Sequence, residues 1–123
     1  MPSVRIDEGD KALFNGDYPK AKLDYQNAVS TSADEKVKAL AFWGLGKTDY
    51  LSGNFPAALD SLRLVVEKYP ESDEAVNSWF LLGEIYFSLD RYQESVDAYE
   101  KYLGFRPNTL ESYVQGKLGN AYT

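Results

Sequence analysis

Apolar side chains recur along this chain at intervals of three and four residues, the spacing of one face of an α-helix. Short polar or glycine-containing turns and prolines interrupt the pattern at 16–17, 53–54, 70, 89–92 and 107. The pattern predicts an all-α chain of seven helices without strands. The pattern gives bounds for five of these helices, at about 4–15, 18–31, 33–52, 92–105 and 109–122.

Large and small residues also recur with a period of 37 residues. One set is Trp79, Leu82, Gly83, Tyr86, Asp90, Tyr92, Ser95, Tyr99, Tyr102 and Pro107. The set 37 residues upstream is Phe42, Leu45, Gly46, Asp49, Gly53, Phe55, Ala58, Leu62, Val65 and Pro70. A fainter third copy is Gly9, Ala12, Gly16, Tyr18, Ala21, Tyr25 and Ala28. A fixed period with matching side-chain sizes predicts a stack of repeated structural units.

Within each unit, the small residues predict where two helices approach most closely. Gly46 and Gly83 are expected at the contact between the first and second helix of their units, because a Cβ there would separate the pair. Tyr86, Tyr99 and Tyr102 are expected to fill the gap between one unit and the next.

Two segments predict helix starts. Ser32-Ala33-Asp34-Glu35 has the sequence of a capping box, with Ser32 as the N-cap and Glu35 at the third helical position. Ser72 is a second candidate N-cap, followed by acidic residues that suit the first turn of a helix.

The order Trp-x-x-Leu-Gly-x-x-Tyr at 79–86, followed by a small residue, an aromatic residue and a proline, resembles the tetratricopeptide repeat (TPR). The resemblance implies a right-handed α-solenoid that forms a single domain over residues 1–123. It would contain three helix-turn-helix units and one C-terminal capping helix. The units are expected at about 2–35, 39–72 and 76–109, with a partial fourth unit at 110–123.

The partial fourth unit predicts a fragment of a longer protein. Leu118, Gly119 and Tyr122 repeat the start of a first helix, and the sequence stops before a second helix. We expect this half-repeat to cap the third unit and to leave an apolar stripe for possible self-association.

Composition narrows the functional classes. The net charge is −6, with 13 basic and 19 acidic residues, and no segment is basic, which argues against a nucleic-acid partner. No apolar run is long enough for direct membrane insertion. The chain has no Cys and no His, and it shows no catalytic constellation. We therefore expect no enzyme activity, no metal and no cofactor.

The resemblance places the first helices on the concave face of the stack. The implied face residues are Ser3, Ile6, Asp7, Asp10, Leu13 and Phe14, then Leu40, Trp43, Gly44, Lys47, Tyr50 and Leu51, then Asn77, Phe80, Leu81, Glu84, Phe87 and Ser88, and finally Tyr113, Gly116, Lys117 and Asn120. The Lys and Asn clamp with which chaperone-adaptor TPR domains hold a C-terminal carboxylate is absent, because Ile6, Asp10, Gly44, Asn77 and Leu81 stand at its positions.

The candidate peptide-binding groove has an aromatic centre with polar edges. Its residues are Trp43, Lys47, Tyr50, Asn77, Phe80, Glu84, Phe87 and Tyr113. Aromatic anchors in a concavity with few polar groups suit an apolar or amphipathic peptide. Alternatively, some of these rings pack between neighbouring helices or are covered by a downstream part of the parent chain.

Two functional interpretations follow. The first is a non-catalytic scaffold that binds a protein or peptide partner. The Tyr69-Pro70 link and the helix after it look like the extended repeats of bacterial envelope TPR proteins, which favours the cell envelope or periplasm. The alternative is the TPR arm of a larger bacterial enzyme, such as a peptidoglycan lytic transglycosylase.

Overall fold

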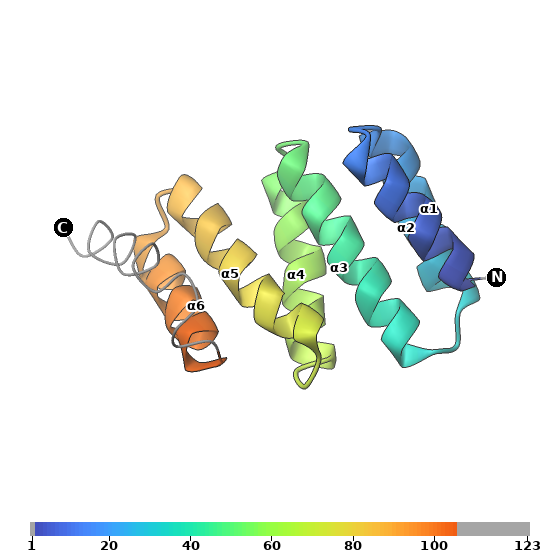
Figure 1. Cartoon of the computed structure of the whole chain (residues 1–123). Helices are drawn as coiled ribbons and strands as arrows, with labels where there is room; N and C mark the ends of the chain where they lie inside the picture. The colour runs from blue at the N-terminus through green and yellow to red at the C-terminus, as the bar shows by residue number, and fades with distance from the viewer. Residues whose placement is uncertain (1, 106–123) are drawn as a thin grey trace.

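The computed structural model describes residues 2–105, and it describes the side chains of residues 5–105. Over this range the chain forms six α-helices and no strand, so the prediction of an all-α fold is confirmed (Figure 1). The helices are α1 (Pro2–Phe14), α2 (Tyr18–Thr31), α3 (Glu35–Leu51), α4 (Phe55–Lys68), α5 (Asp73–Ser88) and α6 (Tyr92–Phe105). The seventh expected helix, at 109–122, lies outside the described residues.

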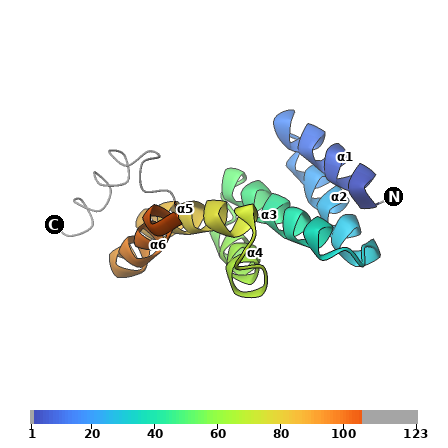
Figure 2. The same cartoon turned by 60° about the horizontal axis from the view of Figure 1, so that its bottom comes forward.

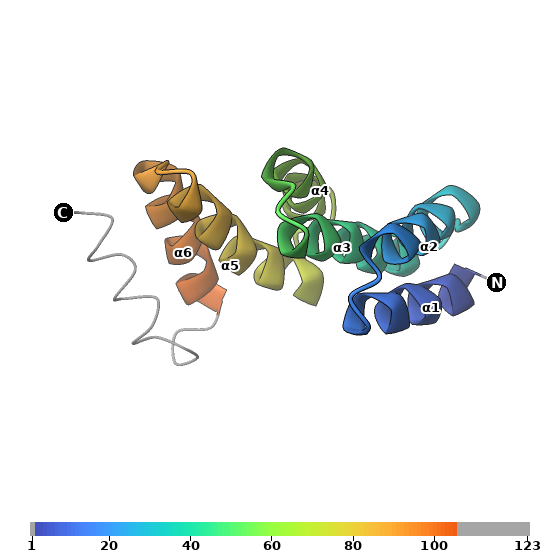
Figure 3. The same cartoon turned by 90° about the horizontal axis from the view of Figure 1, so that it is seen from above.

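The helices pair in sequence order as α1 with α2, α3 with α4, and α5 with α6 (Figure 1). Each second helix also packs against the first helix of the next pair, α2 against α3 and α4 against α5. The first helices α1, α3 and α5 follow one another along one side of the stack (Figure 2). Seen from above, the third pair is turned relative to the second (Figure 3). This arrangement is an α-solenoid of helix-turn-helix units.

The turns within the pairs lie where the sequence predicts them. Gly16 and Gly53 adopt φ angles of 77° and 84°, a left-handed conformation that glycine adopts without steric cost. Asp90 takes the same role in the third pair, with φ of 61°. Because each turn is short, the two helices of a unit stay antiparallel.

One predicted helix start is wrong and one is confirmed. The backbone N–H of Ser32 donates to the carbonyl of Ala28, so Ser32 closes α2 and is not the N-cap of α3. Asp34 is that N-cap, since its carboxylate accepts from the backbone N–H of Lys36 at 2.9 Å. The hydroxyl of Ser72 accepts from the backbone N–H of Ala75 at 3.1 Å, as expected for the N-cap of α5.

Close helix contacts within the units depend on glycine. A Cβ on Gly46 would lie 2.5 Å from Cδ2 of Leu62, and one on Gly83 would lie 2.6 Å from Cε1 of Tyr99. Both predicted contacts are confirmed. The ring of Tyr99 packs inside its own unit, where the missing Cβ of Gly83 leaves room for it, and its expected contact with the following unit lies outside the described residues.

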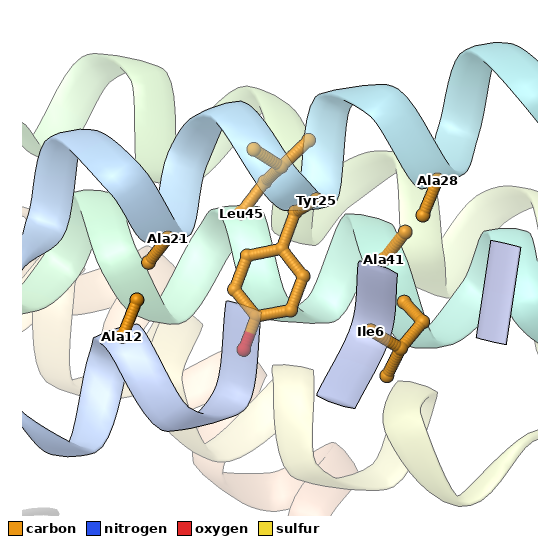
Figure 4. Packing of buried hydrophobic residues seen from close by; sticks show 7 residues of the cluster. All are labelled: Ile6, Ala12, Ala21, Tyr25, Ala28, Ala41 and Leu45. Atoms are coloured by element: carbon orange, nitrogen blue, oxygen red, sulfur yellow. The ribbon is translucent and has the colours of Figure 1, made fainter. Parts of the chain in front are cut away.

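The core of the first unit continues directly into the second. Tyr25 is fully buried and points from α2 towards α1 (Figure 4). Its ring lies where a Cβ on either Gly9 of α1 or Gly44 of α3 would clash, within 2.7 Å and 2.5 Å. The other buried residues of this cluster are Ile6, Ala12, Ala21, Ala28, Ala41 and Leu45. A single ring therefore joins three helices from two units.

Candidate functional site

An open cavity of about 350 Å³ lies between the first helices of the second and third units. We call it the α3–α5 groove. Its lining among the described residues is Trp43, Lys47, Tyr50, Leu51, Asn77, Phe80, Leu81 and Tyr102. Most of these side chains are apolar or aromatic, which is typical of a pocket that holds an apolar ligand group.

The α3 wall of the groove consists of side chains spaced one turn apart. Trp43 and Tyr50 pack against the buried cluster formed by α4, α5 and α6. The Nζ of Lys47 lies 5.2 Å from the centroid of the Trp43 ring, within the range of a cation–π interaction. Tyr50 stacks on Phe55 of α4 with ring centroids 6.0 Å apart. Burial raises the pKa of the Tyr50 phenol, and the Glu84 carboxylate raises it further.

The opposite wall is held by aromatic contacts between α5 and α6. Phe80 meets Tyr102 with ring centroids 5.1 Å apart and Tyr99 with centroids 6.0 Å apart. Asn77 lies one turn before Phe80 and supplies a side-chain amide to the same cavity. Both walls are therefore fixed by packing within the protein.

The structure brings five of the eight predicted groove residues together in this cavity: Trp43, Lys47, Tyr50, Asn77 and Phe80. Glu84 and Phe87 are not part of its lining. The Glu84 carboxylate accepts a hydrogen bond from the hydroxyl of Tyr99. Phe87 packs on Tyr92 of α6 with ring centroids 5.5 Å apart. Tyr113 lies outside the described residues. Ligand binding by these residues stays a prediction.

Two residues that the resemblance placed on the concave face are buried instead. Ile6 belongs to the core of the first unit, and Gly44 lies under the ring of Tyr25. Tyr102 also lines the groove, which the sequence did not predict, and its expected contact with the following unit lies outside the described residues. The repeat pattern assigns α6 to the outer layer, so only the contact of Tyr102 with Phe80 reveals this role.

The buried carboxylates of the described part serve the packing of helices. Asp24 accepts from Lys20 Nζ at 2.7 Å and from Arg5 at 3.3 Å. Asp49 of α3 accepts from Lys22 of α2 at 3.0 Å and so joins the first two units. Within residues 2–105, no group of His, Cys, Asp and Glu side chains is placed to hold a metal ion.

A second cavity, of about 310 Å³, lies between α4, α5 and α6. Apolar side chains form part of it, and three carboxylates and one guanidinium lie among its lining residues. These residues are Arg63, Val66, Glu67, Trp79, Leu82, Tyr86, Glu94, Asp97 and Ala98. Arg63 donates to the hydroxyl of Tyr86 at 2.6 Å, which links the second and third units.

The stacked helix pairs and the groove between two first helices define a helical-repeat protein. The sequence matches the tetratricopeptide repeat family over residues 6–73 and 52–108, and the chain belongs to this family. A solved structure described as the crystal structure of MamA protein is similar, with a TM-score of 0.60 and 20% sequence identity. That similarity covers 98% of this chain and 80% of the MamA chain. No curated protein matches the sequence.

The family sets the class of function. Tetratricopeptide repeats are typically non-catalytic scaffolds that mediate protein interactions, and this chain has their fold. Among the helices that the structure describes, none is long and apolar enough to cross a membrane.

Proposed function

We propose that this chain is a non-catalytic scaffold that binds an apolar or amphipathic peptide segment of a partner protein in the α3–α5 groove. The observation that carries the proposal is the cavity itself, in which Trp43 and Phe80 face a shared space of about 350 Å³. Large aromatic side chains in a concave site are the usual anchors of peptide recognition.

The groove is organised before any ligand arrives. Phe80 is held between Tyr99 and Tyr102, and Tyr50 is held by Phe55. A peptide that enters therefore does not have to order these rings, and less conformational entropy is lost on binding.

Exposed apolar side chains extend the surface beyond the groove. Leu51 lines the cavity and is 53% exposed. Phe14, at the same repeat position in the first unit, is 92% exposed. Both stand at the ends of first helices, next to the turns that share one edge of the stack in Figure 1. A longer peptide can use this edge after its anchor fills the groove.

The test uses a random-peptide library displayed on phage and selected on the immobilised chain. We expect the selected peptides to carry apolar anchors. Trp43→Ala and Phe80→Ala should each weaken binding of a selected peptide about 30-fold or more, the effect of losing a hot-spot side chain. Leu23→Ala is the matched control, because Leu23 is an exposed apolar residue of α2 outside the groove.

Thermal melting of each variant separates lost binding from lost folding. Phe80→Leu, which keeps an apolar side chain, serves as a second variant if Phe80→Ala melts early. Binding in the groove would be contradicted by peptides that bind the Trp43 and Phe80 variants as tightly as they bind the unsubstituted protein. The same peptides would lose affinity for Leu23→Ala.

The second candidate role, as an arm of a larger enzyme such as a lytic transglycosylase, uses the same scaffold. The coding sequence downstream of Thr123 distinguishes the two roles, because a catalytic domain there would select the second. Placement in a bacterial cell envelope or periplasm rests on the resemblance of the repeats, and fractionation of cells that express the full gene tests it.

A further inference from the structure

One repeat position on the first helices is charged in all three units. Asp10, Lys47 and Glu84 occupy it, each 37 residues after the last. The residue 15 positions later, on the second helix, is Tyr25 in the first unit, Leu62 in the second and Tyr99 in the third. The charge is therefore negative where the partner position holds tyrosine, and positive where it holds leucine.

In the first and third units, the two positions form a hydrogen bond. The hydroxyl of Tyr25 donates to Oδ1 of Asp10 at 2.5 Å, and the hydroxyl of Tyr99 donates to Oε1 of Glu84. Both tyrosines are fully buried, and a buried hydroxyl requires a partner. Burial raises the pKa of Tyr25, and the hydrogen bond to Asp10 adds to the increase. These two carboxylates thus provide hydrogen-bond acceptors for the buried tyrosine hydroxyls of their own units.

The second unit is the exception. Leu62 offers no polar atom, and the cation at Lys47 lies over the Trp43 ring in the groove. No carboxylate in the described part of the chain forms an ion pair with Lys47. The described lining of the groove contains no acidic residue, and its other polar side chains are Asn77 and the tyrosines. Glu84 lies outside the lining, where its charge raises the pKa of Tyr50. Its carboxylate accepts a hydrogen bond from the hydroxyl of Tyr99.

From this we infer that the groove selects an acidic apolar segment, in which an Asp or Glu side chain meets Lys47 while a neighbouring apolar side chain enters between Trp43 and Phe80. The inference rests on the proposed function and names the chemistry of its ligand. A cation against an aromatic wall is partly removed from water, so a carboxylate gains more there than at an open surface.

A side-chain carboxylate fits the site better than a chain terminus. Lys47 and Asn77 offer one cation and one amide to a carboxylate, and because the cavity is open, the peptide chain can continue past it. The net charge of −6 does not attract acidic ligands over long distances, so the preference must come from this local contact.

The experiment selects the displayed library on two proteins, the parent and Lys47→Glu. Peptides are displayed as internal insertions without a free C-terminus. On the parent we expect enrichment of Asp or Glu next to an apolar residue, and on Lys47→Glu we expect Lys or Arg at that place. Lys101→Glu changes the net charge equally from an exposed site on α6, and it should keep the acidic preference.

Affinity measurements then test the contact directly. For a peptide selected on the parent, we expect Lys47→Met to weaken binding about tenfold, in line with the loss of a charge-assisted hydrogen bond. Changing the peptide's acid to its amide should have the same effect on the parent, and little further effect on Lys47→Met.

The outcomes separate the inference from the proposed function. Apolar peptides without acidic preference, whose binding depends on Trp43 but ignores Lys47→Glu, overturn the inference and leave the groove intact. If peptides bind only with a free C-terminal carboxylate and lose binding when that terminus is amidated, the carboxylate that meets Lys47 does not come from a side chain. Failure to select any peptide whose binding depends on Trp43 and Phe80 overturns both.

Discussion

Gly83 shows how one missing side chain sets a helix contact. A Cβ at this position would lie 2.6 Å from Cε1 of Tyr99, whose ring is fully buried. Because the hydroxyl of Tyr99 also donates a hydrogen bond to Glu84, the ring has little freedom to move away. We expect Gly83→Ala to lower the free energy of unfolding by about 1–3 kcal/mol, as overpacking of a core does.

Gly104→Ala is the matched control for this prediction. Gly104 also lies in a helix, and among residues 2–105 a Cβ there would meet no atom within 4 Å. Alanine is favoured over glycine in helices by about 0.5–1 kcal/mol, so this variant should be as stable as the parent or more stable. Denaturant unfolding of both variants measures the difference, and equal stability of the two would contradict the close contact.

Two buried serines differ in what their hydroxyls contact. Ser95 donates to the carbonyl of Gly83 at 2.9 Å, whereas the hydroxyl of Ser78 has no hydrogen-bond partner in the described structure. Both residues are 0% exposed. We expect Ser78→Ala to be neutral or stabilising, while Ser95→Ala should cost about 0.5–1.5 kcal/mol. Thermal melting that ranks the two variants in the opposite order would show that Ser78 has a partner.

At the residue scale, the sequence predicted the aromatic groove better than its charged edge. The resemblance to the tetratricopeptide repeat places Trp43 and Phe80 at one repeat position of neighbouring first helices, and both line the cavity. The hydrogen bond from Tyr99 to Glu84 depends on a contact between two helices, which the periodicity of the sequence does not show. A signal was nevertheless present, since tyrosine and acid recur together at an offset of 15 residues in the first and third units.

Helix starts belong to the scale of elements, and α3 and α4 begin differently. Asp34 caps α3 with its carboxylate, whereas Asn54 stands at the N-cap of α4 without a side-chain hydrogen bond. We expect Asp34→Ala to lower stability by about 0.5–2 kcal/mol, the usual cost of a lost cap. Asn54→Ala should cost less, because no capping bond is removed. Urea unfolding with equal losses for the two variants would contradict this difference.

The bounds expected for the first, second, third and sixth helices lie within two residues of the observed ones. The observed bounds of α2 and α6 match the expected ranges of 18–31 and 92–105. The start of α3 was misjudged because Ser32 and Asp34 both favour the N-cap position in sequence. The packing of α2 decides between them, since α2 continues to Thr31 and keeps Ser32 as its C-cap.

At the scale of the whole molecule, the units are joined by polar contacts as well as by their apolar cores. Lys22 of the first unit reaches the buried carboxylate of Asp49 in the second. Arg63 of the second unit donates to Tyr86 in the third. Each unit contacts its neighbours in sequence, so the stability of the stack depends on the interfaces between adjacent units.

The end of the stack is expected to follow the packing of the other units. The second helices α2 and α4 each pack against the first helix of the following unit. Buried side chains stand at the same repeat position in all three second helices, Ala28, Val65 and Tyr102. The repeat logic therefore predicts that residues 109–122 cover α6, although they lie outside the described residues.

We expect deletion after Asn108 to lower the melting temperature clearly, because loss of a covering helix exposes apolar surface worth about 1.5–3 kcal/mol for each large side chain uncovered. Leu118→Asn, on the predicted apolar stripe, should act in the same direction, whereas Lys117→Asn should not. If the truncated chain melts no earlier than the full chain, these residues do not form a cap.

We also expect the 123-residue chain to self-associate through the predicted helix at 109–122, because each first helix of the described units packs on a second helix. Sedimentation of the full chain should then show an increase in mass with concentration that Leu118→Asn alters and Lys117→Asn does not. A strict monomer at high concentration would mean that this helix is polar enough to remain in water, as Gly116, Lys117 and Asn120 would make it. Capping is a contact within one chain and does not depend on that result, so truncation and sedimentation test separate properties of the same segment.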